Sequence, residues 1–147
     1  MSRLNRCTKE SRQALAIARA EAWRLGHKAV GTEHILLGIL KLNDPLIEGL
    51  FASLHVSTLR VTEVLEYVVG RSNKALVGEP SLSAMARTAL VIAEQEATSA
   101  QAELIGVEHL LLGLFSERDG VTVGVLESFG VYLSPARQQF TTLLSKG

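Results

Sequence analysis

The sequence predicts an all-α protein made of two tandem four-helix repeats related by pseudo-twofold symmetry. A decapeptide at 31–40 (Gly-Thr-Glu-His-Ile-Leu-Leu-Gly-Ile-Leu) returns at 106–115 as Gly-Val-Glu-His-Leu-Leu-Leu-Gly-Leu-Phe. The same offset relates the flanking residues without any gap, and apolar residues recur at helical spacing while no strand signal competes. Self-similarity at a fixed offset indicates two copies of one structural unit.

The first predicted helix, at 8–25, has a narrow stripe of mostly small apolar residues. The stripe consists of Ala14, Ile17, Ala18, Ala22 and Leu25. Their spacing of three and four residues is that of one helix face. Because alanine dominates this face, we expect the neighbouring helix to approach closely, and Gly26 is a suitable stop.

The other helices of the first copy follow from burial pattern and capping residues. Residues 32–42 are apolar on nearly every side, which is typical of a buried helix. Asp44 followed by proline begins a third helix that runs to about Leu54. Ser57 caps a fourth helix, which Gly70 ends.

Residues 71–80 lack periodicity and are rich in turn formers, which predicts a linker. We therefore expect one domain over 1–147, with repeat one at 1–70 and repeat two at 81–147. In repeat two, Ser83 caps the first helix, and further helices are expected at 107–117, about 121–129 and 135–145. Ser134 and Pro135 would begin the last of these.

Composition excludes several classes of partner. The 147 residues carry 15 Lys and Arg against 15 Asp and Glu, so net charge gives no attraction to nucleic acid. No apolar run approaches the roughly 20 residues of a membrane span. A chain of this length needs no metal or disulfide to fold, and the lone Cys7 points to a reducing compartment. We expect neither nucleic acid nor membrane as a partner.

The candidate binding residues are two Glu-His pairs, duplicated intact within apolar surroundings. Glu33 and Glu108 would each lie in the first turn of a helix, where the helix dipole alone favours a carboxylate. The alternative is that each carboxylate binds a guanidinium in a bidentate manner. Hydroxyls of Thr8 and Ser83, at nearby helix starts, could then donate to an anion. The histidines that follow could simply anchor a loop by hydrogen bonding.

Motifs for catalysis are missing from the sequence. A zinc protease needs His-Glu-x-x-His on one helix, whereas here the order is Glu-His without a second histidine one turn later. Four scattered histidines and one cysteine make no zinc site, and there is no phosphate-binding Gly-x-x-x-x-Gly-Lys-Ser/Thr loop. We expect no enzyme activity, no catalytic residue, no metal and no cofactor. An acid–base role for Glu33 and His34 suggests no substrate class.

The doubled decapeptide resembles the N-terminal repeat domain of Clp-type AAA+ unfoldases, nearest the ClpC kind. The segments 18–22, 25–27 and 125–131 extend the resemblance to essentially the whole chain. It implies a binding module for substrates and adaptor proteins, which are handed to a hexameric unfoldase and a protease core. It also implies recognition of phosphorylated arginine by Glu33 and Glu108, with Thr8 and Ser83 near the phosphate. The implied location is the bacterial cytoplasm or the chloroplast stroma.

This chain departs from the family pattern at several positions. Cys7 replaces the usual phenylalanine before Thr8, Val107 replaces the motif threonine, and residues 83–86 read Ser-Ala-Met-Ala instead of Thr-Pro-Arg-Ala. Repeat two also has Ala-Gln-Ala at 100–102 where repeat one has Leu-Gly-His. The sequence given contains no AAA+ module, which leaves two hypotheses: a recruiting domain of an unfoldase, or a free-standing accessory subunit that docks on the Clp protease core.

Overall fold

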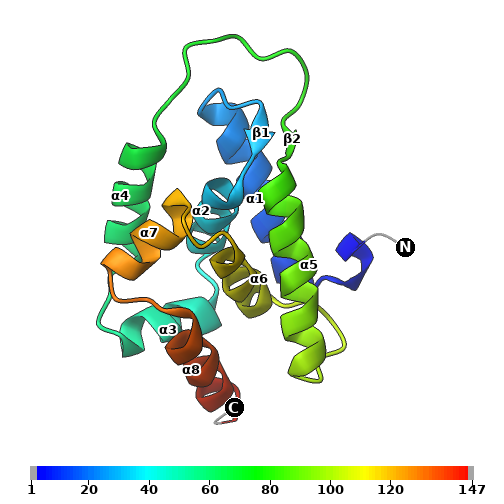
Figure 1. Cartoon of the computed structure of the whole chain (residues 1–147), viewed down its shortest axis with the longest axis vertical. Helices are drawn as coiled ribbons and strands as arrows, with labels where there is room; N and C mark the ends of the chain where they lie inside the picture. The colour runs from blue at the N-terminus through cyan, green and yellow to red at the C-terminus, as the bar shows by residue number, and fades with distance from the viewer. Residues whose placement is uncertain (1–2, 146–147) are drawn as a thin grey trace.

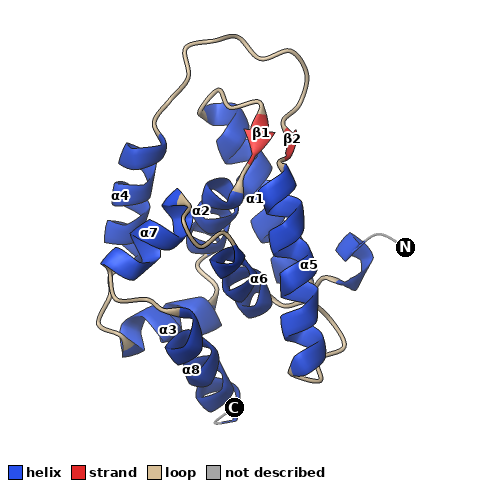
Figure 2. Cartoon of the chain, in the orientation of Figure 1, coloured by secondary structure: helices blue, strands red, loops and turns tan. Residues whose placement is uncertain are grey.

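Helices account for nearly all regular structure in the computed structural model, which describes residues 3–145 (Figures 1 and 2). The α-helices in this range are α1 (Lys9–Arg24), α2 (Thr32–Leu42), α3 (Pro45–Ser53), α4 (Thr58–Val69), α5 (Ala84–Ser99), α6 (Val107–Gly113), α7 (Val121–Ser128) and α8 (Leu133–Ser145). Two 3₁₀ turns, η1 (Arg3–Arg6) and η2 (Leu114–Ser116), and two short strands, β1 (Ala29–Val30) and β2 (Ser81–Leu82), complete the fold. The expected all-α class is confirmed.

Helix starts follow the predicted caps. Four side chains at predicted helix starts accept a hydrogen bond from a first-turn N–H: Thr8 from Ser11 (3.1 Å), Asp44 from Leu46 (3.0 Å), Ser57 from Arg60 (3.2 Å) and Ser83 from Ala86 (3.0 Å).

Two helix boundaries differ from the expectation. The helix expected at 107–117 ends as an α-helix at Gly113, and its last turn tightens into the 3₁₀ turn η2. The last helix begins at Leu133, so Ser134 and Pro135 lie within its first turn instead of starting it. Proline is tolerated there because the first N–H groups of a helix have no partner within the helix.

The two repeats pack so that each contact occurs twice with the roles exchanged. α3 packs on α8 while α4 packs on α7, as Figure 1 shows. Likewise α1 contacts α6 while α2 contacts α5. Since α5 to α8 are the second copies of α1 to α4, this exchange is the pseudo-twofold symmetry expected from the duplication.

Short strand pairings tie the repeats together at two equivalent places. β1 and β2 pair in parallel, with Val30 opposite Leu82. The equivalent residues, Cys7 and Ile105, form a parallel bridge on the other side of the symmetry axis. The segment before the first helix of each repeat thus pairs with the loop before the second helix of the other. Pairings of one or two residues are too short to give a period-two signal, so the sequence shows no sign of them.

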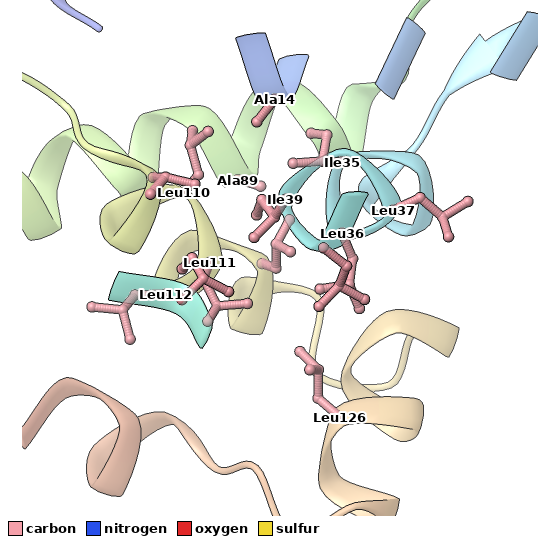
Figure 3. Packing of buried hydrophobic residues seen from close by; sticks show 14 of the residues in the cluster. Ala14, Ile35, Leu36, Leu37, Ile39, Ala89, Leu110, Leu111, Leu112 and Leu126 are labelled. Carbon is pink, nitrogen blue, oxygen red and sulfur yellow. The ribbon is translucent and has the colours of Figure 1, made fainter. Parts of the chain in front are cut away.

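The core lies between the two central helices, α2 and α6. Leu36 and Leu111 are both fully buried, with 0% exposed surface. Figure 3 shows them in one apolar cluster with Ile39 and Leu126.

Helices α1 and α2 approach closely, as the alanine stripe predicts. A Cβ atom on Gly38 would overlap the backbone carbonyl oxygen of Ala14. The second copy repeats this contact between Gly113 and Ala89. Both central helices are therefore held at a distance that only glycine allows.

Candidate functional site

The two motif glutamates lie at the starts of α2 and α6, each folded against its own N-cap glycine. A Cβ atom on Gly31 would overlap Oε1 of Glu33, and one on Gly106 would overlap Oε1 of Glu108. Both glycines have negative φ, −95° and −86°. A side chain at either position would therefore displace the glutamate carboxylate, while the backbone conformation itself does not require glycine. The glycines give the carboxylates room to fold back beside the first helical turn, where the helix dipole favours negative charge.

The motif histidines anchor these helix starts. Nδ1 of His34 accepts the N–H of Gly31 at 2.9 Å, and Nδ1 of His109 accepts that of Gly106 at 2.8 Å. An accepting Nδ1 requires the neutral ring with its proton on Nε2. Burial, reinforced by the nearby His27, lowers the pKa of His34 to about 4, and burial also lowers the pKa of His109. The loop-anchoring interpretation accounts for both rings.

A neutral His34 changes how its contact with Glu33 should be understood. Its Nδ1 lies 3.7 Å from Oε1 of Glu33, but an uncharged ring forms no ion pair. Within residues 5–145, no lysine or arginine pairs with Glu33 or Glu108. Both carboxylates thus lack a cationic partner within these residues.

The histidine anchors predict an acid-dependent loss of stability. In the unfolded chain a histidine binds its proton near pH 6.5, whereas folded His34 resists protonation down to about pH 4. The unfolded state therefore binds more protons in this window, and stability falls as pH drops from about 6.5 to 4, on the order of 3 kcal/mol for His34. Urea unfolding at pH 7, 5.5 and 4 measures this loss.

Glutamine variants isolate the histidine contribution from that of other acid-sensitive groups. A glutamine at the third helical position can also bond the N-cap N–H, but it does not titrate there. His34→Gln should retain most of the stability at pH 7 and lose part of the pH dependence, and His109→Gln should act in the same direction. An identical pH dependence in wild type and His34→Gln would show that this anchor is not the sensitive group.

Strand pairing brings each glutamate near a hydroxyl of the other repeat. The N–H of Thr8 donates to the carbonyl of Ile105 at 3.0 Å, three residues before Glu108. The N–H of Ser83 donates to the carbonyl of Val30 at 2.9 Å, three residues before Glu33. Thr8 and Glu108 accordingly line the same hollow, and Ser83 and Glu33 occupy the equivalent positions of the other copies.

The two hydroxyls differ in what they can still donate. Oγ1 of Thr8 donates to Oγ of Ser11 at 3.0 Å, and Ser11 in turn donates to the carbonyl of Ile105 at 2.7 Å. Ser83 accepts from Ala86 as a cap, and its hydroxyl proton has no acceptor within the described residues. Of these two hydroxyl groups, that of Ser83 is the one whose proton is available to a ligand.

The Thr8–Glu108 site is a hollow of about 280 Å³ with acidic walls. The carboxylates of Glu10 and Asp44 line it along with Glu108, and no lysine or arginine does. A cavity lined by one sign of charge attracts the opposite sign. Sequence reasoning missed Glu10 and took Asp44 only as a helix cap, because both come from repeat one while the motif glutamate comes from repeat two.

Comparison with known families identifies the domain. The model of the Clp repeat (R) N-terminal domain matches residues 6–129 and 81–147. The chain belongs to this family. As a Clp N-terminal repeat domain it is non-catalytic, and the chain contains no ATPase or protease module.

Relatives of this Clp domain come from bacteria and from a chloroplast. It is 34% identical to the chaperone ClpB of Oceanobacillus iheyensis and 34% identical to ClpC/MecB, a negative regulator of genetic competence, of Bacillus subtilis. Each match covers 95% of this chain and 17% of the relative. The chloroplastic ClpC2 of rice (Oryza sativa) is 33% identical, over 99% of this chain and 16% of that protein.

Solved structures share the fold at low sequence identity. The N-domain of ClpV from Vibrio cholerae superimposes with a TM-score of 0.82 at 16% identity, covering 97% of this chain and 87% of that one. The N-terminal domain of ClpD from Arabidopsis thaliana gives 0.73 at 23% identity, with 97% and 96% coverage. A complex of a ClpV N-domain with a VipB peptide gives 0.76 at 17% identity, with 97% and 89% coverage.

Two other features bear on the class of the protein. In the part of the chain that the structure describes, no helix is both long and apolar enough to cross a bilayer. Over the same residues, no three His, Cys, Asp or Glu side chains gather closely enough to hold a metal ion.

Proposed function

We propose that this Clp domain binds peptide segments of substrates or adaptor proteins and brings them to a Clp unfoldase. The observation that carries the proposal is the state of Glu33 and Glu108. Each carboxylate lies beside its N-cap glycine in the first turn of an anchored helix and has no cationic partner within residues 5–145. A carboxylate without a cationic partner can accept a cation from outside the chain. The ClpV N-domain solved with a VipB peptide supports peptide binding on this fold.

The ligand group that fits both glutamates is a guanidinium, and the two sites suit different forms of it. At the Ser83–Glu33 site, the hydroxyl proton of Ser83 is available to a phosphate, so phosphoarginine is the ligand proposed there. At the Thr8–Glu108 site, Glu10 and Asp44 would repel a phosphate. Unmodified arginine is the ligand proposed for that second site.

Titration of fluorescent peptides tests this assignment. Three peptides would differ at one position only, carrying arginine, phosphoarginine or the neutral analogue citrulline. Glu108→Gln should weaken binding of the arginine peptide by about tenfold or more, the value of a charged hydrogen-bonded contact. Glu33→Gln should do the same for the phosphoarginine peptide, and Glu63→Gln serves as a control outside both sites. If the Glu33→Gln, Glu108→Gln double variant binds each of the three peptides as tightly as wild type does, the recruiting role of these carboxylates is refuted.

Docking of this domain on the Clp protease core, as a free-standing accessory subunit, stays a prediction. It requires co-migration with the peptidase ring in the absence of any unfoldase. Location in the bacterial cytoplasm or chloroplast stroma also stays a prediction, supported by relatives of both kinds.

A further inference from the structure

A second and larger cavity shares Glu108 and His109 with the acidic hollow. It has a volume of about 410 Å³ and lies between the end of α5, the start of α6 and α8. Its lining consists of Glu96, Ser99, Ala100, Glu108, His109, Leu112, Arg137, Phe140, Thr141 and Leu144. This volume is within the range of ligand-binding pockets.

The cavity lies where repeat two has lost large side chains that repeat one retains. In repeat one, Arg24 extends from α1 to Glu66 on α4 and also bonds Glu21. His27 covers His34 there, with Nδ1 of His27 2.8 Å from Nε2 of His34.

The equivalent positions in repeat two are occupied by Ser99, which lines the cavity, and Ala102, which lines the acidic hollow. Neither side chain is long enough to make the repeat-one contacts. Ala100, which also lines the cavity, replaces Leu25 of repeat one. The shorter Ser99 and Ala100 therefore leave open a space that Arg24 and Leu25 fill in the first copy.

Charges inside the cavity are already satisfied. Arg137 holds Glu96 in a bidentate pair, with N–O distances of 3.0 and 2.7 Å. His109 is neutral, since its Nδ1 accepts a backbone N–H. One wall is apolar, made by Leu112 and Phe140. The interior thus suits an uncharged apolar group, and only Glu108, at the border with the acidic hollow, still lacks a partner.

We infer that this cavity receives a large apolar side chain of a bound peptide, adjacent to a cationic side chain that pairs with Glu108. The inference rests on the proposed peptide-binding function and adds a sequence preference to it: an arginine beside an aromatic or large aliphatic residue. Repeat one, with its equivalent space filled by Arg24 and Leu25, has no such preference.

A pair of matched peptides tests the preference. One carries Arg-Phe and the other Arg-Ala at the same place. Wild type should bind the Arg-Phe peptide about tenfold more tightly, as expected for burial of an aromatic side chain. The double variant Ser99→Arg, Ala100→Leu restores the repeat-one residues at two positions that line the cavity. Glu96 already pairs with Arg137, and the added arginine can share it as Arg24 shares Glu21 with Lys41. This variant should bind both peptides equally, at the wild-type affinity for Arg-Ala.

A second variant, at the rim of the cavity, provides a test that does not depend on the folding of the double variant. Leu144 is 55% exposed, so Leu144→Glu should fold normally and also reduce the preference for Arg-Phe. Equal affinity of wild type for the two peptides would overturn the inference while leaving arginine recognition by Glu108 intact.

Indole, used as a free probe of the cavity, separates this inference from the proposed function. In NMR titrations, indole should shift the resonances of Leu112 and Phe140 in wild type and not in the double variant. An absence of shifts in wild type would overturn the inference. Indole binding without binding of any peptide would confirm an apolar cavity but refute its assignment to a peptide side chain, together with the proposed function.

Discussion

Gly38→Ala is expected to destabilise the domain by about 2 kcal/mol or more, and Gly113→Ala should act in the same way. The added Cβ would overlap the carbonyl oxygen of Ala14 in the first case and of Ala89 in the second. Both obstacles are backbone atoms of a packed helix, so the helices must move apart, and overpacking of this kind costs about 1–3 kcal/mol or more. Alanine has a higher helix propensity than glycine by only about 1 kcal/mol. The steric cost should therefore exceed the gain.

A second pair of helical glycines provides the matched control. A Cβ on Gly49 would meet Leu143 at 3.6 Å, an ordinary van der Waals contact, and one on Gly124 would meet nothing within 4 Å. At these positions propensity alone should act, so alanine should stabilise by up to about 1 kcal/mol. Urea unfolding of the four variants measures the free energy of unfolding, which should fall for Gly38→Ala and Gly113→Ala and rise for Gly49→Ala and Gly124→Ala. Stabilisation by Gly38→Ala would show that the close approach of α1 and α2 does not constrain this domain.

The internal repeat made most of the fold predictable from the sequence. Helix starts in one copy could be compared with those in the other, and apolar residues on nearly every side indicated the buried helix at 32–42. The exchange of pairing segments between repeats was not predictable. The contact between Cys7 and Ile105 is one residue pair long and joins positions far apart in the chain. Local patterns contain no information about such a contact.

The candidate site was only partly predictable for the same reason. Duplication singled out Glu33 and Glu108, and capping patterns singled out Thr8 and Ser83. Which hydroxyl accompanies which glutamate depends on the strand exchange, and so does the presence of Glu10 in the hollow beside Glu108. The open cavity next to Glu108 likewise follows from side chains that are missing in repeat two, and their consequence appears only once the helices are packed.

Leu36→Ala is expected to cost about 2–5 kcal/mol, and Leu111→Ala a similar amount. Both side chains are fully buried in the central cluster of Figure 3, so truncation removes their apolar contacts and leaves a cavity. A typical domain is stable by only 5–15 kcal/mol, so either change removes a large share of its stability. Denaturant unfolding gives the free energy, and Leu59→Ala, at a position 69% exposed on α4, should change it by less than about 0.5 kcal/mol.

The two leucine variants also test whether the repeats share a single core. If α2 and α6 form one cluster across the symmetry axis, each truncation should lower a single cooperative transition of the whole domain. Two separated transitions, with Leu36→Ala lowering one and Leu111→Ala the other, would mean that the repeats are independent bundles. A loss well under 1 kcal/mol from either variant would contradict the central position of these helices. The Thr8–Glu108 site contains residues from both repeats. It therefore exists only while the two repeats stay folded and packed against each other, which a single cooperative transition would support.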